Sequence, residues 1–382
     1  MKTLFCIFPH CYVKVTNREL LVYDTLKYKN LYFTDYEIAQ LDRDTLSKGY
    51  IFDRDETKQL ISSLLTCGMG YYLEYGKTLP YLNDRKIKFT ISLEKEYRSL
   101  SHNLASYTNT LLKTTTILCN NSIKSNYSDL EHSQIGYPIH NCCKIDYSFI
   151  LQQLHSFPYL ERIIISGEIE EQAYASLLSF AKKNSISLTH RVFLEKASIE
   201  KILNDLEEND ILFVEVIVDR NADLSNLAFH NRLYYKALVN DVSDVSLFSN
   251  LHNVSYTPII SKKEFNEELL KQMIMTKEEV LSFKSSKRTC LLSDFINSAA
   301  FGTITINYDY NVSCVGQHIG SIQDTDLSNL INKWIRNEHC MWYFYRGKKD
   351  SCQDCALSSL CPSINIYETQ GIYQCPCNKL ND

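Results

Sequence analysis

Several familiar signals are missing from this sequence of 382 residues. No apolar run approaches the length that a membrane-spanning helix needs, and Pro9, His10 and Lys14 interrupt the amino terminus, which argues against a secretory signal. The ten histidines form neither a His-x3-His nor a His-Glu-x2-His pattern, and the chain has no phosphate-binding loop and no nucleophile elbow. Hydrolase and nucleotide-dependent functions therefore lack support, and we expect a cytoplasmic protein with no membrane partner.

An excess of positive charge is also absent. The formal net charge is −5, with 22% charged and 45% hydrophobic residues, a balance typical of soluble globular proteins. This composition gives no electrostatic reason to expect nucleic acid as a partner. The chain is long enough for two or three domains with their own cores, and neither an internal repeat nor a low-complexity linker divides it.

Cysteine, by contrast, is plentiful: the chain has 14, and five of them crowd into 26 residues near the carboxyl end. Cys352 and Cys355 form a Cys-x2-Cys pair, which places two thiolates on one tight turn, and Cys361 follows six residues later. A further cysteine from beyond this loop would complete a four-sulfur cage, which suits an iron–sulfur cluster or a zinc ion. Without a secretory context, disulfides or buried unreactive thiols are the weaker interpretation.

The amino-terminal region predicts a small α+β unit. Apolar alternation from Phe5 to Tyr23, broken by a polar turn at 16–19, indicates a β-hairpin. The apolar period over 55–67 predicts an amphipathic helix that ends at Gly68. The simplest role of this amino-terminal unit is to pack against the rest of the protein. A more specific hypothesis is that an exposed strand edge of the unit binds an extended peptide by β-augmentation.

From about residue 86 the pattern changes to alternating strands and helices. Such βα repeats imply a parallel sheet covered by helices, either an open sheet or a partial barrel, with ligands at the carboxyl ends of the strands. The predicted strands span 112–119, 162–168, 188–194, 211–218, 234–239 and 254–260. The predicted helices span 147–154, 170–183, 198–206, 224–229, 242–251, 263–273 and 277–283.

The tail carries a family resemblance. Two short strands at 302–306 and 311–314, the latter with Cys314, precede a Gly320-Ser321-Ile322 turn, a helix over 326–336 and the spaced cysteines. This order resembles a SPASM domain, the auxiliary iron–sulfur module of radical SAM enzymes that mature ribosomally made peptides. The sequence from Leu360 to Glu368 resembles the corresponding segment of pseudo-radical-SAM proteins of Bacteroidetes peptide-modification systems, and that of SPASM-only maturases that accompany ATP-grasp ligases. Upstream, 165–168 stands where a radical SAM barrel carries its Gly-Gly-Glu motif.

The resemblance implies three parts. They are an α+β unit over 1–85 that is a possible peptide-recognition element, a degenerate radical-SAM-like partial (β/α) barrel over 86–300, and a SPASM-like iron–sulfur domain over 301–382. It implies one [4Fe-4S] cluster, with zinc as the alternative metal. Asn365 stands where a complete module has another cysteine, and a second cluster, which we do not expect, would draw on Cys314, Cys340 and Cys290. The implied ligands of the single cluster are Cys352, Cys355, Cys361 and Cys377, with Cys375 as the alternative fourth.

One departure from the family outweighs the matches. A radical SAM enzyme needs Cys-x3-Cys-x2-Cys after its first barrel strand, but the corresponding loop here has only Cys119, and the next thiols are the adjacent Cys142 and Cys143. We therefore predict that the protein does not cleave S-adenosylmethionine. The implied role is a non-catalytic partner in peptide maturation that binds a precursor peptide, a true radical SAM enzyme as a heterodimer, or both, while its cluster supports the fold or relays electrons.

Two alternatives remain open. The first is a radical SAM-like peptide-modifying enzyme whose cluster is re-sited on Cys119, Cys142 and Cys143, and the second is a zinc-stabilised scaffold. Three residues of interest also have plain structural interpretations. We expect Glu168 to be a carboxylate near a helix amino terminus, and Trp342 and Arg346 to pack around the metal loop.

Overall fold

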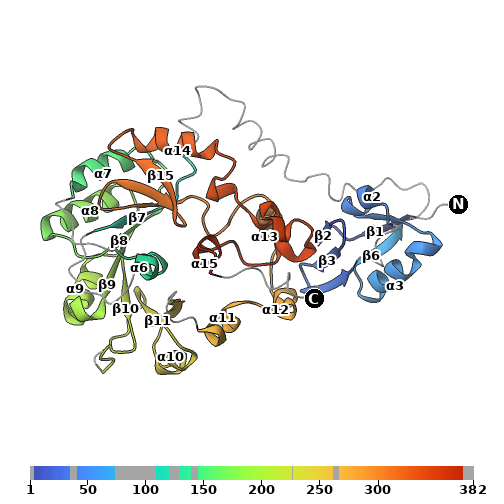
Figure 1. Ribbon diagram of the computed structural model, residues 1–382, viewed down its shortest axis with the longest axis horizontal. Coiled ribbons are helices and arrows are strands. Elements are labelled where there is room, and N and C mark those ends of the chain that lie inside the picture. Colours follow the sequence, from blue (N-terminus) through green and yellow to red (C-terminus); the bar gives the residue numbers. More distant parts are fainter. Residues whose placement is uncertain are drawn as a thin grey trace.

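The computed structural model describes residues 4–34, 41–73, 109–119, 129–138, 145–225, 227–260 and 266–372. Within these ranges the protein is mixed α/β, with one large and mostly parallel sheet and a smaller unit formed by the amino-terminal residues (Figure 1). None of the helices in the described ranges is both long and apolar enough to cross a membrane.

The large sheet has nine strands in the order β12-β11-β10-β9-β8-β7-β13-β14-β15. Strands β7 to β12 are parallel neighbours in chain order, β13 returns to pair in parallel with β7, and β14 and β15 continue antiparallel. Their bounds are β7 Thr114–Leu118, β8 Arg162–Ser166, β9 Ser187–Phe193, β10 Leu212–Val218, β11 Leu233–Val239, β12 Val254–Pro258, β13 Thr303–Ile306, β14 Asn311–Cys314 and β15 Gln317–Ser321.

Helices lie on both faces of this sheet. One face of the sheet packs in a shared core with α7, α8, α9 and α10, and the opposite face packs against α6 (Figure 1). Side-chain caps begin several of them, for example Asp146 before α7 and Ser198 before α9. The bounds are α6 Asp129–Ile135, α7 Tyr147–Leu154, α8 Glu171–Lys183, α9 Ile199–Glu208, α10 Val242–Leu247, α11 Glu267–Met273, α12 Lys277–Ser282, α13 Lys287–Ser293, α14 Leu327–Ile335 and α15 Ile366–Thr369.

The amino-terminal unit holds two antiparallel three-stranded sheets, β5-β1-β6 and β2-β3-β4. The predicted hairpin is confirmed for β2 and β3, while β1 pairs in the other sheet. The predicted helix is α3, which ends before Gly68, a residue with φ of +64° that suits glycine. The bounds are β1 Leu4–Ile7, β2 Cys11–Val15, β3 Leu20–Asp24, β4 Lys29–Phe33, α2 Arg43–Ser47, β5 Tyr50–Phe52, α3 Lys58–Thr66 and β6 Gly70–Leu73.

Most predicted βα units are confirmed, but two details of the prediction are wrong. The described residues of 224–229 form no helix. Gly320 and Ser321, predicted as a turn, lie in β15. Gly320 has φ of +150°, and a Cβ there would lie 2.6 Å from Leu330 of α14, so the glycine lets that helix approach the strand. The sheet also continues across residue 300, because β13 pairs with β7.

Candidate functional site

The segment 350–361 carries the three predicted metal ligands that the structure describes. Cys352 ends one 3₁₀ turn, Asp350–Cys352, and Cys355 caps the next, Ala356–Ser359. The Cys355 N–H donates to the Cys352 carbonyl over 3.2 Å, so both residues belong to one tight turn, as their spacing predicts. Cys352 is buried, and Cys355 and Cys361 are half-buried. Cys375 and Cys377 lie outside the described residues, so the closing ligand stays a prediction.

A buried cation stands beside these thiols. Arg346 donates two hydrogen bonds to the Glu368 carboxylate, at 3.1 and 2.8 Å, and its Nε donates to the Pro362 carbonyl. Lys349 adds a third contact to Glu368 at 2.9 Å. Burial acts to lower the pKa of Arg346, but the charges of Glu368 and of the nearby Cys361 and Cys352 sulfurs raise it above its usual value.

Trp342 has the packing role that its position suggested. Its side chain is completely buried, its indole N–H donates to the Thr303 carbonyl over 2.9 Å, and its ring packs against Phe301 and Trp334. It therefore joins the segment before the cysteines to β13 and α14, and its carbonyl also accepts a hydrogen bond from the Asn297 N–H over 3.0 Å.

The spacing of the three thiols bears on the metal that they would hold. Three metal-ligating atoms that all lie within 4.8 Å of one another occur in the described ranges only in the amino-terminal unit, so Cys352, Cys355 and Cys361 do not form so compact a group. A single zinc ion with Zn–S bonds of about 2.3 Å draws its sulfurs to about 3.8 Å apart. A four-iron cluster takes its cysteines on different irons and holds them further apart. The cluster and the zinc ion therefore both stay as predicted alternatives for this segment.

The cysteines named for a second cluster lie elsewhere. Cys314 and Cys340 are near enough for the charge of one to affect the other, and burial raises the pKa of each to about 12. Cys290 belongs to α13, where it packs against apolar residues from the amino-terminal unit and from the cysteine segment. The expectation of a single cluster remains a prediction.

The cysteine segment is also the surface on which the amino-terminal unit docks. Side chains from β2 and β3 form one apolar cluster with α12, α13 and the 3₁₀ turn that follows Cys355. Cys355 and Cys361 pack against the edge of this cluster. The buried members are Tyr12, Leu21, Tyr23, Val280, Cys290, Ala356, Leu357 and Leu360.

Polar contacts from β2 reinforce this docking. The Tyr12 hydroxyl donates to Asp294 over 2.5 Å and lies 2.7 Å from the Ser359 hydroxyl. Lys14 donates to Asp294, Ser358 and Ser359 at 2.7, 2.6 and 2.7 Å. Burial, followed by the charge of Asp294, raises the pKa of Tyr12 well above its usual value, so the hydroxyl keeps its proton.

The turn between β2 and β3 reaches the residues between Cys352 and Cys361. Glu19 accepts a hydrogen bond from the Ala356 N–H over 2.7 Å. Thr16 and Asn17 donate to the backbone and side-chain oxygens of Asp354, each over 3.0 Å. The conformation of the predicted metal loop is therefore tied directly to the position of the amino-terminal unit.

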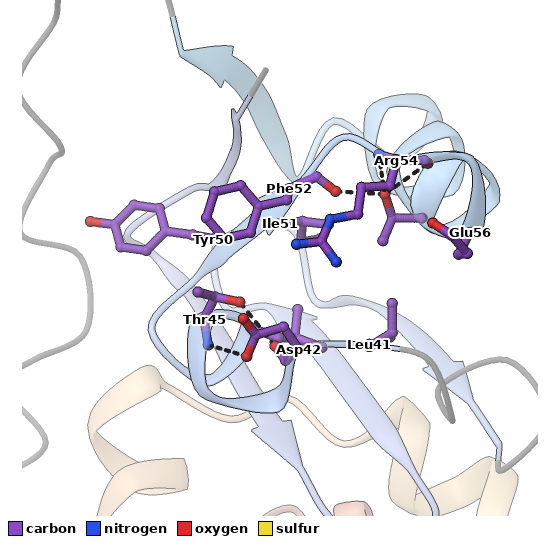
Figure 2. Close-up of a pocket in the computed structure, with 10 residues that line it drawn as sticks. Leu41, Asp42, Thr45, Tyr50, Ile51, Phe52, Arg54 and Glu56 are labelled. Carbon is purple, nitrogen blue, oxygen red and sulfur yellow. Dashed lines mark hydrogen bonds between the residues drawn. The ribbon is translucent and has the colours of Figure 1, made fainter. Parts of the chain in front are cut away.

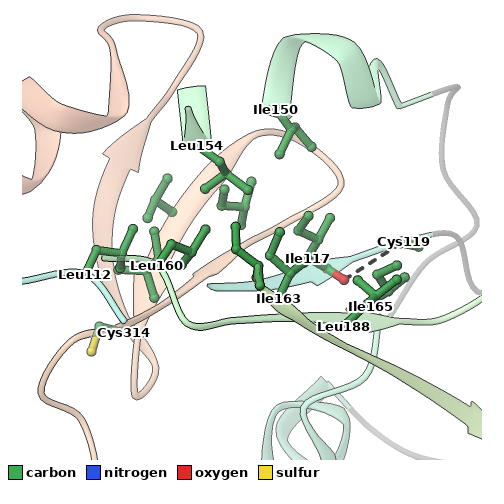
Figure 3. Close-up of a cluster of buried hydrophobic side chains, with 14 of the residues drawn as sticks. Leu112, Ile117, Cys119, Ile150, Leu154, Leu160, Ile163, Ile165, Leu188 and Cys314 are labelled. Atoms are coloured by element: carbon green, nitrogen blue, oxygen red, sulfur yellow. Dashed lines mark hydrogen bonds between the residues drawn. The ribbon is translucent and has the colours of Figure 1, made fainter. Parts of the chain in front are cut away.

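Cys119, the thiol of the alternative cluster site, has very different surroundings. It follows β7, is completely buried among apolar side chains, and points its sulfur towards the Ile117 carbonyl, 3.7 Å away (Figure 3). Burial raises its pKa to about 12, so it remains a protonated thiol at neutral pH. Cys142 and Cys143 lie outside the described residues.

The inner face of the large sheet, opposite α7 to α10, is covered by the end of α6 and the residues after it. Arg191 of β9 and Ser166 of β8 both donate to the Gly136 carbonyl, each over 2.9 Å, and Lys236 of β11 donates to the Ile135 carbonyl over 2.6 Å. An apolar cluster completes this cover with Ile135, Tyr137, Phe193, Ile217, Leu238 and Ile259. Residues 135–137 are therefore held against strands β8, β9 and β11 on this face.

Charged residues on this face form a connected group. Arg191 pairs with Glu215 of β10, whose pKa is lowered by Arg191 and Lys236 although burial acts to raise it. Burial and the Arg191 charge lower the pKa of Lys236 to about 7, against the opposing effect of Glu215. This group was not among the residues predicted from the sequence. A lone charge within an otherwise apolar strand, such as Glu215 or Lys236, is the signal that identifies it.

Glu168 lies where the sequence suggested, just before a helix. α8 has Glu170 at its cap and Glu171 in its first turn, so Glu168 precedes the helix by three residues. After burial, the charges of Glu168 and Cys119 raise the pKa of Tyr137, which places this carboxylate near the cover of the inner face.

Comparisons with known proteins give a loose structural match. No protein-family model matches the chain, and no curated protein matches it by sequence. The fold is similar to Streptococcus suis SuiB bound to its precursor peptide SuiA, with 11% identity, 98% of each chain covered and a TM-score of 0.45. Structures of SuiB alone and of SuiB bound to S-adenosylmethionine give 10% and 11% identity, 97% coverage of each chain and TM-scores of 0.44 and 0.43. Because these TM-scores lie below 0.5, the match assigns no activity to this chain.

A small pocket in the amino-terminal unit is too tight for a peptide side chain. It lies between α2 and β5, where Asp42 accepts from Thr45 and where Thr57 bonds to Phe52 and Arg54 (Figure 2). Its volume of about 20 Å³ has room for roughly one water molecule. This pocket is therefore not a binding site for a peptide side chain.

Proposed function

We propose that this protein is a non-catalytic partner in the maturation of a ribosomally synthesised peptide. In this proposal the amino-terminal unit binds the precursor peptide, a true radical SAM enzyme binds beside it as a heterodimer, and the tail holds one [4Fe-4S] cluster. The observation that carries the non-catalytic part is the covered inner face of the large sheet, next to a solitary thiol at the end of β7.

Two features argue against cleavage of S-adenosylmethionine. The sequence offers one cysteine after β7 where three thiolates are needed, and Cys119 is buried among apolar side chains. The chain's own residues 135–137 are held on the inner face by three hydrogen bonds and an apolar cluster. A bound cofactor would have to displace them and leave Arg191 and Lys236 without their carbonyl partners, which is costly for buried charges.

The same cover bears on where a peptide would bind. With the inner face filled, the amino-terminal unit is the better candidate of the two regions that the sequence suggested. Strand β4 pairs on one side with β3, and no other described strand pairs with it, so β-augmentation of this sheet would add a peptide strand at β4. Both edge strands of the sheet also pack towards the cysteine segment, β2 through Tyr12 and β4 through Tyr32.

The tail residues supply the expected ligands of the cluster. Cys352, Cys355 and Cys361 would hold three irons, and Cys377, or Cys375 in its place, the fourth. Arg346 and Lys349 place positive charge beside an anionic centre, and the docking of β2 and β3 covers one side of the segment. Such a cluster would supply one-electron redox chemistry or rigidity, and in this protein its residues would orient the amino-terminal unit.

Metal analysis and an activity assay test this proposal together. The full chain, purified without oxygen, should contain about four irons and four sulfides, and should release no deoxyadenosine from S-adenosylmethionine in the presence of a reductant. One zinc ion and no iron would support the scaffold alternative. Deoxyadenosine formation that Cys119→Ala abolishes would support the re-sited cluster and overturn the non-catalytic role.

A binding assay tests the partner role separately. Short peptides encoded in the same gene cluster should bind to the immobilised chain, as should the radical SAM enzyme encoded there. A chain with intact secondary structure that captures neither partner would contradict the proposed function even if its iron content is as expected.

A further inference from the structure

A second group of metal-ligating side chains lies in the amino-terminal unit, away from the tail cysteines. Cys11 begins β2 and stands directly opposite Asp24, the last residue of β3, and His10 precedes Cys11 in the chain. One ligand atom from each of these three residues lies within 4.8 Å of the other two. The hairpin register and a neighbouring turn therefore bring a nitrogen, a sulfur and an oxygen ligand to one point.

Two of the ligand atoms are buried and lack a hydrogen bond. The Asp24 side chain is 0% exposed; its Oδ1 accepts from the N–H groups of Leu26 and Lys27 at 2.9 and 3.0 Å, and its Oδ2 accepts from none. His10 Nε2 is buried and also lacks a hydrogen bond, with Asp24 Oδ1 at 3.4 Å. Buried polar atoms are seldom left in this state, so each calls for a partner.

We propose that His10, Cys11 and Asp24 bind a zinc ion. Imidazole, thiolate and carboxylate are its common protein ligands, and three protein ligands plus one water is a frequent zinc arrangement. Burial and the charge of Asp24 raise the pKa of Cys11 to about 12, and its thiol donates to the Met69 carbonyl over 3.8 Å, so zinc binding would release this proton. With Cys11 as a thiolate and Asp24 as a carboxylate, the charge of Zn²⁺ would be neutralised. This site is separate from the cluster ligands and does not depend on the proposed function.

The positive charges of Lys27 and Lys287 would oppose a bound cation, but the positions of the two side chains leave room for one. Lys27 Nζ is 4.0 Å from Asp24 Oδ2, but its side chain is 53% exposed and can turn into solvent. Lys287 is held by the Pro9 carbonyl at 2.6 Å. The competing explanation is a simple ion pair between His10 and Asp24. The two explanations differ in the effect of the Lys27 charge: it would help to neutralise Asp24 in an ion pair, but it would weaken the binding of a zinc ion.

Zinc titration of the full chain tests the proposal. In a chain with its five tail cysteines changed to alanine, one zinc ion should bind and raise the melting temperature. His10→Ala and Asp24→Asn should each weaken binding at least about tenfold, since loss even of outer partners of a zinc site costs that much. Cys67→Ala, which changes a nearby thiol outside the trio, is the matched control and should leave binding unchanged. Lys27→Gln should tighten it.

A second measurement covers the case in which the tail variant does not fold. The cluster-loaded wild-type chain is given one equivalent of zinc, and X-ray absorption at the zinc edge reports its neighbours. One sulfur with nitrogen and oxygen neighbours supports the site, whereas four sulfurs would mean that zinc binds to the tail and would overturn it. Binding that is unaffected in both His10→Ala and Asp24→Asn, or no zinc uptake at all, would also overturn it.

Discussion

The inner face of the large sheet and the cysteine segment both bury positive side chains, but they use them differently. On the inner face, Arg191 and Lys236 bind backbone carbonyls of the chain itself and close the surface. Beside the cysteines, Arg346 and Lys349 bind Glu368 while two sulfurs lie close to the guanidinium group. The first region is therefore held together by backbone contacts of the chain itself, whereas the second pairs its cations with a carboxylate beside two thiols.

The largest expected effect separates the two kinds of cysteine. Cys352→Ala should remove the cluster iron entirely, because it deletes a ligand, whereas Cys119→Ala should leave the iron content unchanged, because that thiol packs in the core of the large sheet and not in the cysteine segment. Iron and sulfide analysis of both variants after anaerobic purification checks this. Equal iron in both would remove the distinction between the regions.

Breaking the buried pair beside the cysteines should come next in size. Glu368→Ala leaves the 7% exposed Arg346 without its carboxylate, and loss of one partner of a buried ion pair typically costs about 3–5 kcal/mol. Urea unfolding of the cluster-loaded chain measures the change. Exposed Glu161, which pairs with Lys113, provides the control: Glu161→Ala should cost less than about 1 kcal/mol.

A smaller effect is expected where the amino-terminal unit docks. Tyr12→Phe removes the hydroxyl that bonds to Asp294, which should cost about 1–3 kcal/mol and increase hydrogen exchange in β2 and β3. Tyr159→Phe, at an exposed tyrosine next to the large sheet, is the matched control and should change neither. If exchange in β2 stays the same in Tyr12→Phe, the polar contacts do not hold the unit in place.

The last expected effect is a change in the pH dependence of stability, caused by Lys236 on the inner face. The pKa of Lys236 is about 7 in the folded protein, below the value near 10.4 in an unfolded chain, so the unfolded state binds more protons between these values. The penalty for burying this amine is therefore complete below about pH 7 and fades as the pH rises towards 10. The wild type should gain stability relative to Lys236→Met from pH 6.5 to 9 in parallel thermal melts. A constant difference would show that Lys236 titrates normally.

Local pattern was enough to predict most of the large sheet. The buried strand β8 ends just before Gly167, which has φ of +113°, and the apolar period of α8 starts soon after, so each boundary has a signal in the sequence. The cysteine spacing likewise predicted the turn that joins Cys352 and Cys355. Both kinds of signal act over a few residues.

Contacts between distant residues were not predictable in this way. The hydrophobic period of a segment predicts a helix but does not predict which face of a sheet that helix covers. The position of α6 and the hydrogen bond from Lys236 to the Ile135 carbonyl could therefore not be predicted. The bond between Glu19 and Ala356 joins residues 337 apart in the chain. Helix α13 was also missed, because Lys287, Arg288 and Thr289 give it a polar start without an apolar period.

The pairing of β13 with β7 has a consequence for the timing of synthesis. Thr303 is the partner of Thr114, so one edge of β7 stays open until about 190 more residues have been made. At 5–20 residues per second this is roughly 10–40 s. An open strand edge can pair with other chains during such a delay. The nascent protein should therefore depend on chaperones most strongly in the interval between the emergence of β7 and that of β13.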